Sequence, residues 1–142
     1  MLRIIAGTLA YLIVTFPLAY VWHLVLFQQT YQELGYIGRD EPIIAFGFTA
    51  ILLQGVILSA LYPKICAGMP LFRGVVTFAL LMGGYHWTMH VLAAAAKHSI
   101  APLSTWFLLE TTYLVLQFSL GTLVFALIHR QFGANEAKLS QE

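Results

Sequence analysis

The sequence has very little charge. Only 9% of its 142 residues are Asp, Glu, Lys or Arg, whereas 60% are hydrophobic and 14% are aromatic. A soluble domain of this length needs more polar surface, so the composition excludes an ordinary soluble globular protein. We expect an integral membrane protein whose main surroundings are the lipid bilayer.

Two further shortages narrow the functional class. Lys and Arg total seven and are not clustered, which argues against a nucleic-acid partner. Cys66 is the only cysteine, so no intrachain disulfide and no cysteine-based zinc or iron–sulfur spacing can be built. No Ser-His-Asp order, Gly-rich phosphate loop or carboxylate pair is present, which leaves an enzyme as the least supported class.

Long apolar runs dominate what remains. Four of them are long enough to cross a hydrocarbon core about 30 Å thick, which takes about 20 helical residues. They predict an all-α, integral membrane four-helix bundle in a single transmembrane domain covering 1–142. The expected helices are about 4–28, 42–62, 72–96 and 102–128, followed by a polar C-terminal tail, 131–142. Pro17 is expected to kink the first helix, and Pro63 to end the second.

The few basic residues predict an orientation. The first apolar run is too long for a signal peptide and lacks a small-x-small cleavage site, so we expect it to remain as a helix. On one side lie Arg3, Lys64, Arg73, Arg130 and Lys138, and on the other lie Arg39 and Lys97. The positive-inside rule therefore predicts two cytoplasmic termini, and the chain has the general form of a small bacterial inner (plasma) membrane protein.

Titratable side chains inside the apolar runs are the main functional clue. His23, His90 and Glu110 each fall roughly 9 to 12 Å below the expected outer boundary, at a helical rise of about 1.5 Å per residue. Such groups are costly in hydrocarbon and usually face the bundle interior or a water-filled cavity. We therefore expect one intramembrane polar site, in the outer half of the bilayer.

Other polar residues extend this site inward. His86 lies one helical turn below His90, and Tyr113 lies at a similar level on the fourth helix. Gln54 and Gln117 lie deeper still, as secondary polar residues. Small residues repeat beside the two histidines of the third helix, which predicts that this stripe faces a neighbouring helix. Trp22 and Trp87 are expected as bulky packing residues or as walls of the site.

The site permits several functions. A proton, an ion or a small ligand is the leading interpretation, because histidine titrates near neutral pH and Glu110 can share a proton with it. As alternatives, His86, His90 and Glu110 could ligate a metal, with His23 completing the shell, and facing histidines could instead hold a haem. The cofactor is left unknown, since the sequence requires none.

A purely structural interpretation competes with these. Interhelical hydrogen bonds from His, Gln and Glu fix which helix faces which, so the cluster could serve packing in an accessory or assembly subunit of a larger membrane complex. Gly55 and Ser59 form a small-xxx-small pair that could face a second copy of the chain in a homo-oligomer. Aromatic residues at the segment ends, including Tyr31, Tyr36 and Trp106, are expected at the membrane interfaces without a ligand role.

Overall fold

The computed structural model describes residues 1–36, 39 and 41–139, with side chains described as far as Gly133. This part of the chain is helical and contains no strand, which confirms the all-α class. Two π-helical turns, η1 and η2, interrupt the α-helices. The elements in order are α1 (Leu2–Val21), η1 (Trp22–Leu26), α2 (Gln28–Glu33), α3 (Ile44–Cys66), α4 (Leu71–Trp87), η2 (Thr88–Leu92), α5 (Ala93–Lys97) and α6 (Leu103–Leu139).

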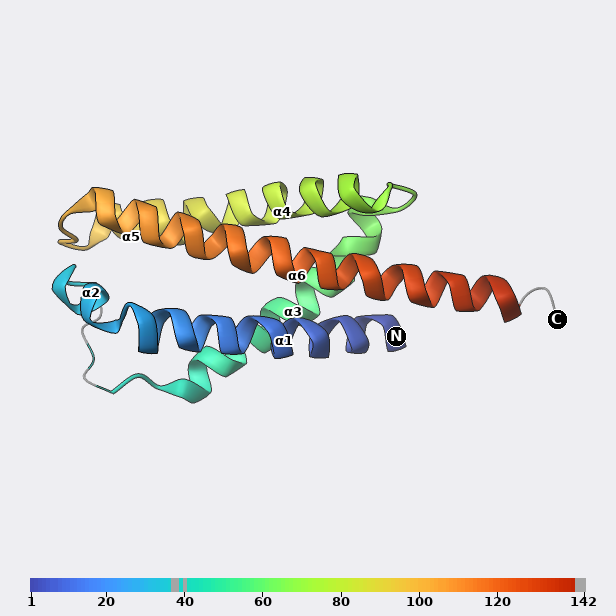
Figure 1. The fold of residues 1–142 in the computed structure, drawn as a ribbon, viewed down its shortest axis with the longest axis horizontal. Helices are drawn as coiled ribbons and strands as arrows, with labels where there is room; N and C mark the ends of the chain where they lie inside the picture. Colours follow the sequence, from blue (N-terminus) through green and yellow to red (C-terminus); the bar gives the residue numbers. More distant parts are fainter. Residues whose placement is uncertain (37–38, 40, 140–142) are drawn as a thin grey trace.

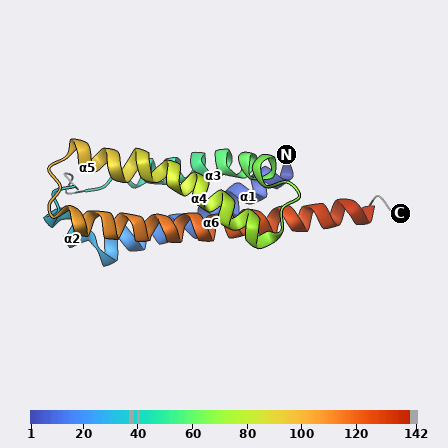
Figure 2. The same ribbon diagram turned by 90° about the horizontal axis from the view of Figure 1, so that it is seen from above.

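Four helical stretches are long and apolar enough to cross a membrane: Leu2–Leu26, Ile44–Cys66, Leu71–Lys97 and Leu103–Gly133. Figure 1 shows α1, α4 and α6 lying along one long axis, while α3 crosses them obliquely. Both chain ends and the α3–α4 turn lie toward one end, here called the terminal end, while α2 and α5 mark the other, called the α2 end (Figures 1 and 2). Large apolar side chains such as Phe46 and Leu80 are exposed, as expected of surfaces that meet lipid.

The boundaries differ from the predicted ones at three places. The first stretch changes from α-helix to a π-helical turn at Trp22 and is followed by the separate helix α2. Pro63 lies inside α3 and does not end it, because Cys66 is buried and its thiol contacts the Gly74 carbonyl of α4 at 3.5 Å, which holds the last turn in place. The expected polar tail continues α6 as far as Leu139, and 140–142 lie outside the described residues.

Small residues bring α1 close to its neighbours. The helix pairs in most extensive contact are α1 with α3, α4 with α6, and α1 with α6. Gly55 of α3 faces Thr8 and Tyr11 of α1, and the Ser59 hydroxyl donates to the Ile4 carbonyl at 3.2 Å. The small-residue pair predicted to face another copy is therefore buried against α1 of the same chain, because close backbone approach within the bundle already uses it.

Two short segments close the α2 end: the turn that follows α2 and the turn between α5 and α6. Gly35 has φ +75°, a left-handed conformation that glycine adopts without strain, and it turns the chain away from α2. The Ala101 amide donates to the Leu34 carbonyl at 3.2 Å, which joins the α5–α6 turn to the end of α2. Leu34 and Ile100 are buried beside this contact. As a result α2 is held against the bundle on the side of Glu110 that faces the α2 end.

Candidate functional site

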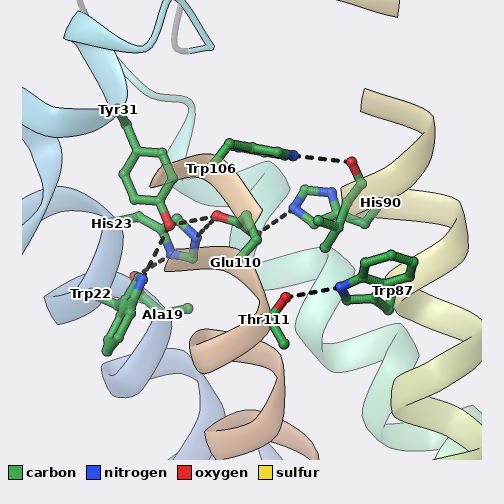
Figure 3. Close-up of polar contacts among 10 residues, drawn as sticks. Ala19, Trp22, His23, Tyr31, Trp87, His90, Trp106, Glu110 and Thr111 are labelled. Carbon is green, nitrogen blue, oxygen red and sulfur yellow. Dashed lines mark hydrogen bonds and ion pairs between the residues drawn. The ribbon is translucent and has the colours of Figure 1, made fainter. Parts of the chain in front are cut away.

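Glu110 is the centre of the polar site. It lies on α6, its side chain is 0% exposed, and it is the one carboxylate among the described side chains that is fully buried. Figure 3 shows Tyr31 and His23 approaching it from one side and His90 from the other. These partners belong to α2, η1 and η2, so groups from three other elements converge on one side chain. We call these four residues the Glu110 centre.

The hydrogen bonds run toward the carboxylate. The Tyr31 hydroxyl donates to Oε1 of Glu110 at 2.5 Å, and Nε2 of His90 lies 2.9 Å from Oε2. The Trp22 indole in turn donates to the Tyr31 hydroxyl at 3.1 Å. A carboxylate that accepts bonds from a hydroxyl and an imidazole is well suited to carry negative charge despite its burial.

His23 is oriented so that one nitrogen is left for Glu110. Its Nδ1 lies 3.0 Å from the Ala19 carbonyl, which can only accept, so Nδ1 must carry a hydrogen. Its Nε2 lies 3.6 Å from Oε1 of Glu110. Nε2 is therefore the nitrogen that gains or loses a proton, and it faces the carboxylate. With Glu110 ionised, a proton on Nε2 turns this contact into an ion pair.

Both histidines of the centre lie in π-helical turns. His23 is in η1 and His90 is in η2. A π turn adds a residue to the α-helical repeat and changes the direction in which side chains point, and such turns occur frequently at functional sites. These two turns, far apart in sequence, thus aim two imidazoles at the same carboxylate.

The centre is buried at its core and open at its edges. The Glu110 side chain is inaccessible, whereas the side chains of His23 and His90 are 24% and 31% exposed. His23 also lines a cavity of about 190 Å³ between α1 and the start of α3, together with Tyr20, Pro42 and Gly47. A cavity of this volume has room for several water molecules. The carboxylate therefore meets its surroundings through the imidazoles.

Aromatic rings cover the centre at the α2 end. Trp106 is fully buried, its indole donates to the Val91 carbonyl at 3.0 Å, and its ring lies 4.4 Å from that of Tyr36. Tyr31 is also 0% exposed, because α2 folds back onto the bundle, so neither Tyr31 nor Trp106 presents its ring at the surface of the bundle. Burial raises the pKa of the Tyr31 and Tyr36 hydroxyls, and the Glu110 charge raises it further.

The remaining predicted residues lie around the centre without hydrogen bonds to Glu110. The ring of Tyr113 meets that of His23 edge-on at 4.5 Å. The His86 ring lies 5.6 Å from those of His90 and Phe118 and lines an apolar cavity of about 340 Å³ between α3 and α4. Trp87 donates to Thr111 at 3.0 Å, away from the carboxylate (Figure 3).

The speculative metal set is not assembled. Across the described residues, no group of three or more His, Cys, Asp or Glu side chains is arranged to hold a metal ion. His86 contacts the ring of His90 and does not approach the carboxylate as a third ligand. Each oxygen of Glu110 already accepts one hydrogen bond, Oε1 from Tyr31 and Oε2 from His90.

A second polar cluster lies one level further from the α2 end. Gln117 donates to the Tyr11 hydroxyl at 2.7 Å and to Oε1 of Gln54 at 3.2 Å, and the Tyr11 hydroxyl donates to the same Gln54 oxygen at 3.2 Å. We call these three residues the neutral triad. It joins α1, α3 and α6, and it contains no group that is charged at neutral pH. The two glutamines predicted as secondary polar residues thus form their own cluster.

Sequence reasoning missed Tyr31 and Tyr11. Tyr31 follows the first apolar run, where counting depth along a straight helix places it outside the membrane. Tyr11 lies within that run and was not distinguished from the apolar residues around it. The one available signal was position, because Tyr11 precedes Thr15 and Ala19 on the stripe that leads to His23.

Comparison with protein-family models, with curated proteins and with solved structures finds no match to this chain. The geometry of the Glu110 centre is therefore the basis on which a function is inferred.

Proposed function

We propose that the chain is an integral membrane protein that binds and releases a proton at the Glu110 centre. One observation carries the proposal: a fully buried carboxylate is held between two partly exposed imidazoles. The apolar length of four helical stretches supports insertion in a membrane. The basic residues Arg3, Lys64, Arg73 and Arg130 favour a cytoplasmic terminal end, with the centre in the outer half of the bilayer.

Of the candidate ligands, the geometry favours the proton. Glu110 is 0% exposed and tightly surrounded, whereas a bound ion or small molecule needs space beside the carboxylate. A proton needs only a lone pair and a donor within reach. Nε2 of His23, at 3.6 Å from Oε1, and Nε2 of His90, at 2.9 Å from Oε2, meet that requirement from opposite sides.

The route of the proton follows from the exposure of the rings. A water molecule that enters the cavity beside His23 can deliver a proton to Nε2, because imidazole exchanges protons near neutral pH. A closer approach of Nε2 to Oε1 then passes the proton to the carboxylate or holds it as an ion pair. His90 provides the second exchange point, on the other side of Glu110.

The decisive experiment follows the carboxyl group itself. The protein is reconstituted in lipid nanodiscs, and infrared difference spectra are recorded as the pH is lowered. We expect a protonated-carboxyl band that disappears in Glu110→Gln, because an amide has no carboxyl proton to gain. Glutamine keeps the shape of the side chain, and its carbonyl oxygen still accepts one of the two hydrogen bonds that Tyr31 and His90 make to Glu110. Glu33→Gln is the matched control, since Glu33 is an exposed carboxylate on α2.

The same samples, labelled at histidine for NMR, test the coupling. We expect the titration curves of His23 and His90 to shift when Glu110 is replaced by Gln and to stay unchanged in Glu33→Gln. A carboxyl band that survives in Glu110→Gln, or histidines that titrate independently of Glu110, would refute the proton proposal.

A structural role is the second candidate. Its supporting observation is that Glu110 joins α6 to α2 and to η2 through bonds made wholly within the chain. On this interpretation the protein is an accessory subunit, Glu110 stays ionised throughout, and no protonated-carboxyl band appears as the pH is lowered. The infrared measurement therefore separates the two candidates.

A further inference from the structure

A cavity of about 360 Å³, lined by both polar and apolar residues, lies at the terminal end of the bundle, far from the Glu110 centre. This volume falls within the usual range of ligand sites, about 300 to 1,000 Å³. Its walls come from α1, from the end of α3 and the turn after it, and from α6. Its polar and cationic lining residues are Arg3, Tyr62, Cys66, His129 and Arg130.

Two arginines and a histidine give the cavity its chemistry. Arg3 lies on α1, while His129 and Arg130 are neighbours on α6. Guanidinium groups donate in a fork that matches the oxygens of a phosphate. The cavity therefore fits an anion with several acceptor oxygens.

His129 adds an independent observation. Both of its ring nitrogens are buried, and the one polar group of the described residues that approaches them is the Ser59 backbone, so at least one nitrogen has no hydrogen-bond partner. Its ring stacks on that of Tyr62, with centroids 5.4 Å apart, which fixes the orientation of the imidazole at the cavity wall. Buried polar atoms without a partner are uncommon and costly, and an acceptor bound in the cavity would satisfy one of these nitrogens.

The depth of the cavity suggests where the anion comes from. Arg3 is next to the start of the first apolar stretch, Cys66 ends the second, Leu71 begins the third, and Arg130 is three residues before the end of the fourth. The cavity is therefore level with the lipid headgroups. Basic pockets between helices at this level bind anionic phospholipid headgroups.

We propose that this terminal-end cavity binds a phosphate group, supplied by the headgroup of an anionic phospholipid. Arg3 and Arg130 bind the phosphate oxygens and His129 donates a further hydrogen bond. The site is independent of the Glu110 centre, and it holds whether or not that centre exchanges protons.

The test compares lipids and variants. Purified full-length protein in detergent is titrated with phosphatidylglycerol, with phosphatidylcholine and with inorganic phosphate, and bound molecules are counted by native mass spectrometry. We expect one tightly bound phosphatidylglycerol, with affinity reduced about tenfold or more in Arg130→Gln or Arg3→Gln. Arg73→Gln is the matched control, because Arg73 is an exposed arginine that does not line the cavity. It should change the affinity less than about twofold.

Each outcome is informative. Competition by inorganic phosphate at equal affinity supports the phosphate site but makes free phosphate its source. Equal binding of phosphatidylcholine, or equal losses in Arg73→Gln and Arg130→Gln, overturns the proposal, because binding would then reflect general attraction to the surface. Circular dichroism of each variant verifies that the helices are retained, and Arg3→Gln gives a second reading if Arg130→Gln does not fold.

Discussion

The two buried polar clusters of this bundle use different chemistry at neighbouring levels. The Glu110 centre joins a carboxylate to two imidazoles and a phenol, and its imidazoles reach the surface. The hydrogen bonds of the neutral triad join Tyr11, Gln54 and Gln117 to one another. Both clusters fix which helices meet, so packing alone explains the triad. Packing does not require a charge, and the charge is what sets the Glu110 centre apart.

The clusters also differ in how they would respond to the loss of one member. In the triad, Tyr11 and Gln54 are bonded to each other and remain paired without Gln117. In the Glu110 centre every contact between members leads to the carboxylate, so its loss leaves the Tyr31 and His90 donors without this acceptor. A closed set of neutral groups tolerates damage, whereas a centre built around one charge does not.

The largest effect that we expect is on the free energy of unfolding, when one member of each cluster on α6 is replaced by leucine. Glu110→Leu should lower the free energy of unfolding by about 3 to 5 kcal/mol, because it leaves buried donors unpaired. Gln117→Leu should cost about 1 to 2 kcal/mol, since its former partners still bond to each other. Unfolding in mixed detergent micelles measures both. Equal losses would show that the charge gives the Glu110 centre no special structural weight.

Tyr31→Phe tests the Glu110 centre through a neutral donor. It removes a hydrogen bond to a carboxylate and leaves the Trp22 indole unpaired, at a cost of about 1.5 to 3 kcal/mol at neutral pH. Burial, followed by the Glu110 charge, raises the pKa of Tyr31 above its ordinary value of 10.0. The contribution of Tyr31 is therefore fully present below pH 10 and declines as the pH rises above it.

The measurement is the difference in unfolding free energy between wild type and Tyr31→Phe at neutral and at alkaline pH. That difference should shrink above pH 10. Subtracting the variant from the wild type removes the contribution of the other tyrosines. A difference that stays constant with pH would show that the folded state does not favour the protonated form of the Tyr31 hydroxyl.

Gly121→Ala tests the neutral triad. A Cβ at Gly121 would lie 2.6 Å from the Tyr11 ring, so that ring must move and weaken its bonds to Gln54 and Gln117. We expect a loss of about 1 to 3 kcal/mol, with the infrared titration of Glu110 unchanged. Gly84→Ala is the control, because a Cβ there meets nothing within 4 Å. A change in the Glu110 titration would show that the two clusters are coupled.

Composition and apolar length were enough to predict the four helices, and counting depth along them placed His23, His90 and Glu110 at one level. The count failed wherever the chain departs from a straight α-helix. The π turn at Thr88–Leu92 begins two residues after His86 and contains His90, and the return of α2 brings Tyr31 back to the bundle. Neither feature has a signature in hydrophobic periodicity, because both depend on contacts between distant segments.

Contacts between distant segments also distinguish Trp22 from Trp87, which look equivalent in the sequence. The smallest effect that we expect is the difference in stability between substitutions at these two residues. Each indole donates one hydrogen bond, Trp22 to the buried Tyr31 and Trp87 to the exposed Thr111. A buried bond within a network contributes more than an exposed one. Trp22→Phe should therefore cost about 0.5 to 1.5 kcal/mol beyond the loss in Trp87→Phe, measured by unfolding in mixed micelles. The extra loss should vanish in a Tyr31→Phe background, since the acceptor is then absent. If the extra loss persists in the Tyr31→Phe background, the ring of Trp22 stabilises the bundle by packing alone. The hydrogen bond from Trp22 to Tyr31 then adds nothing to the stability of the Glu110 centre.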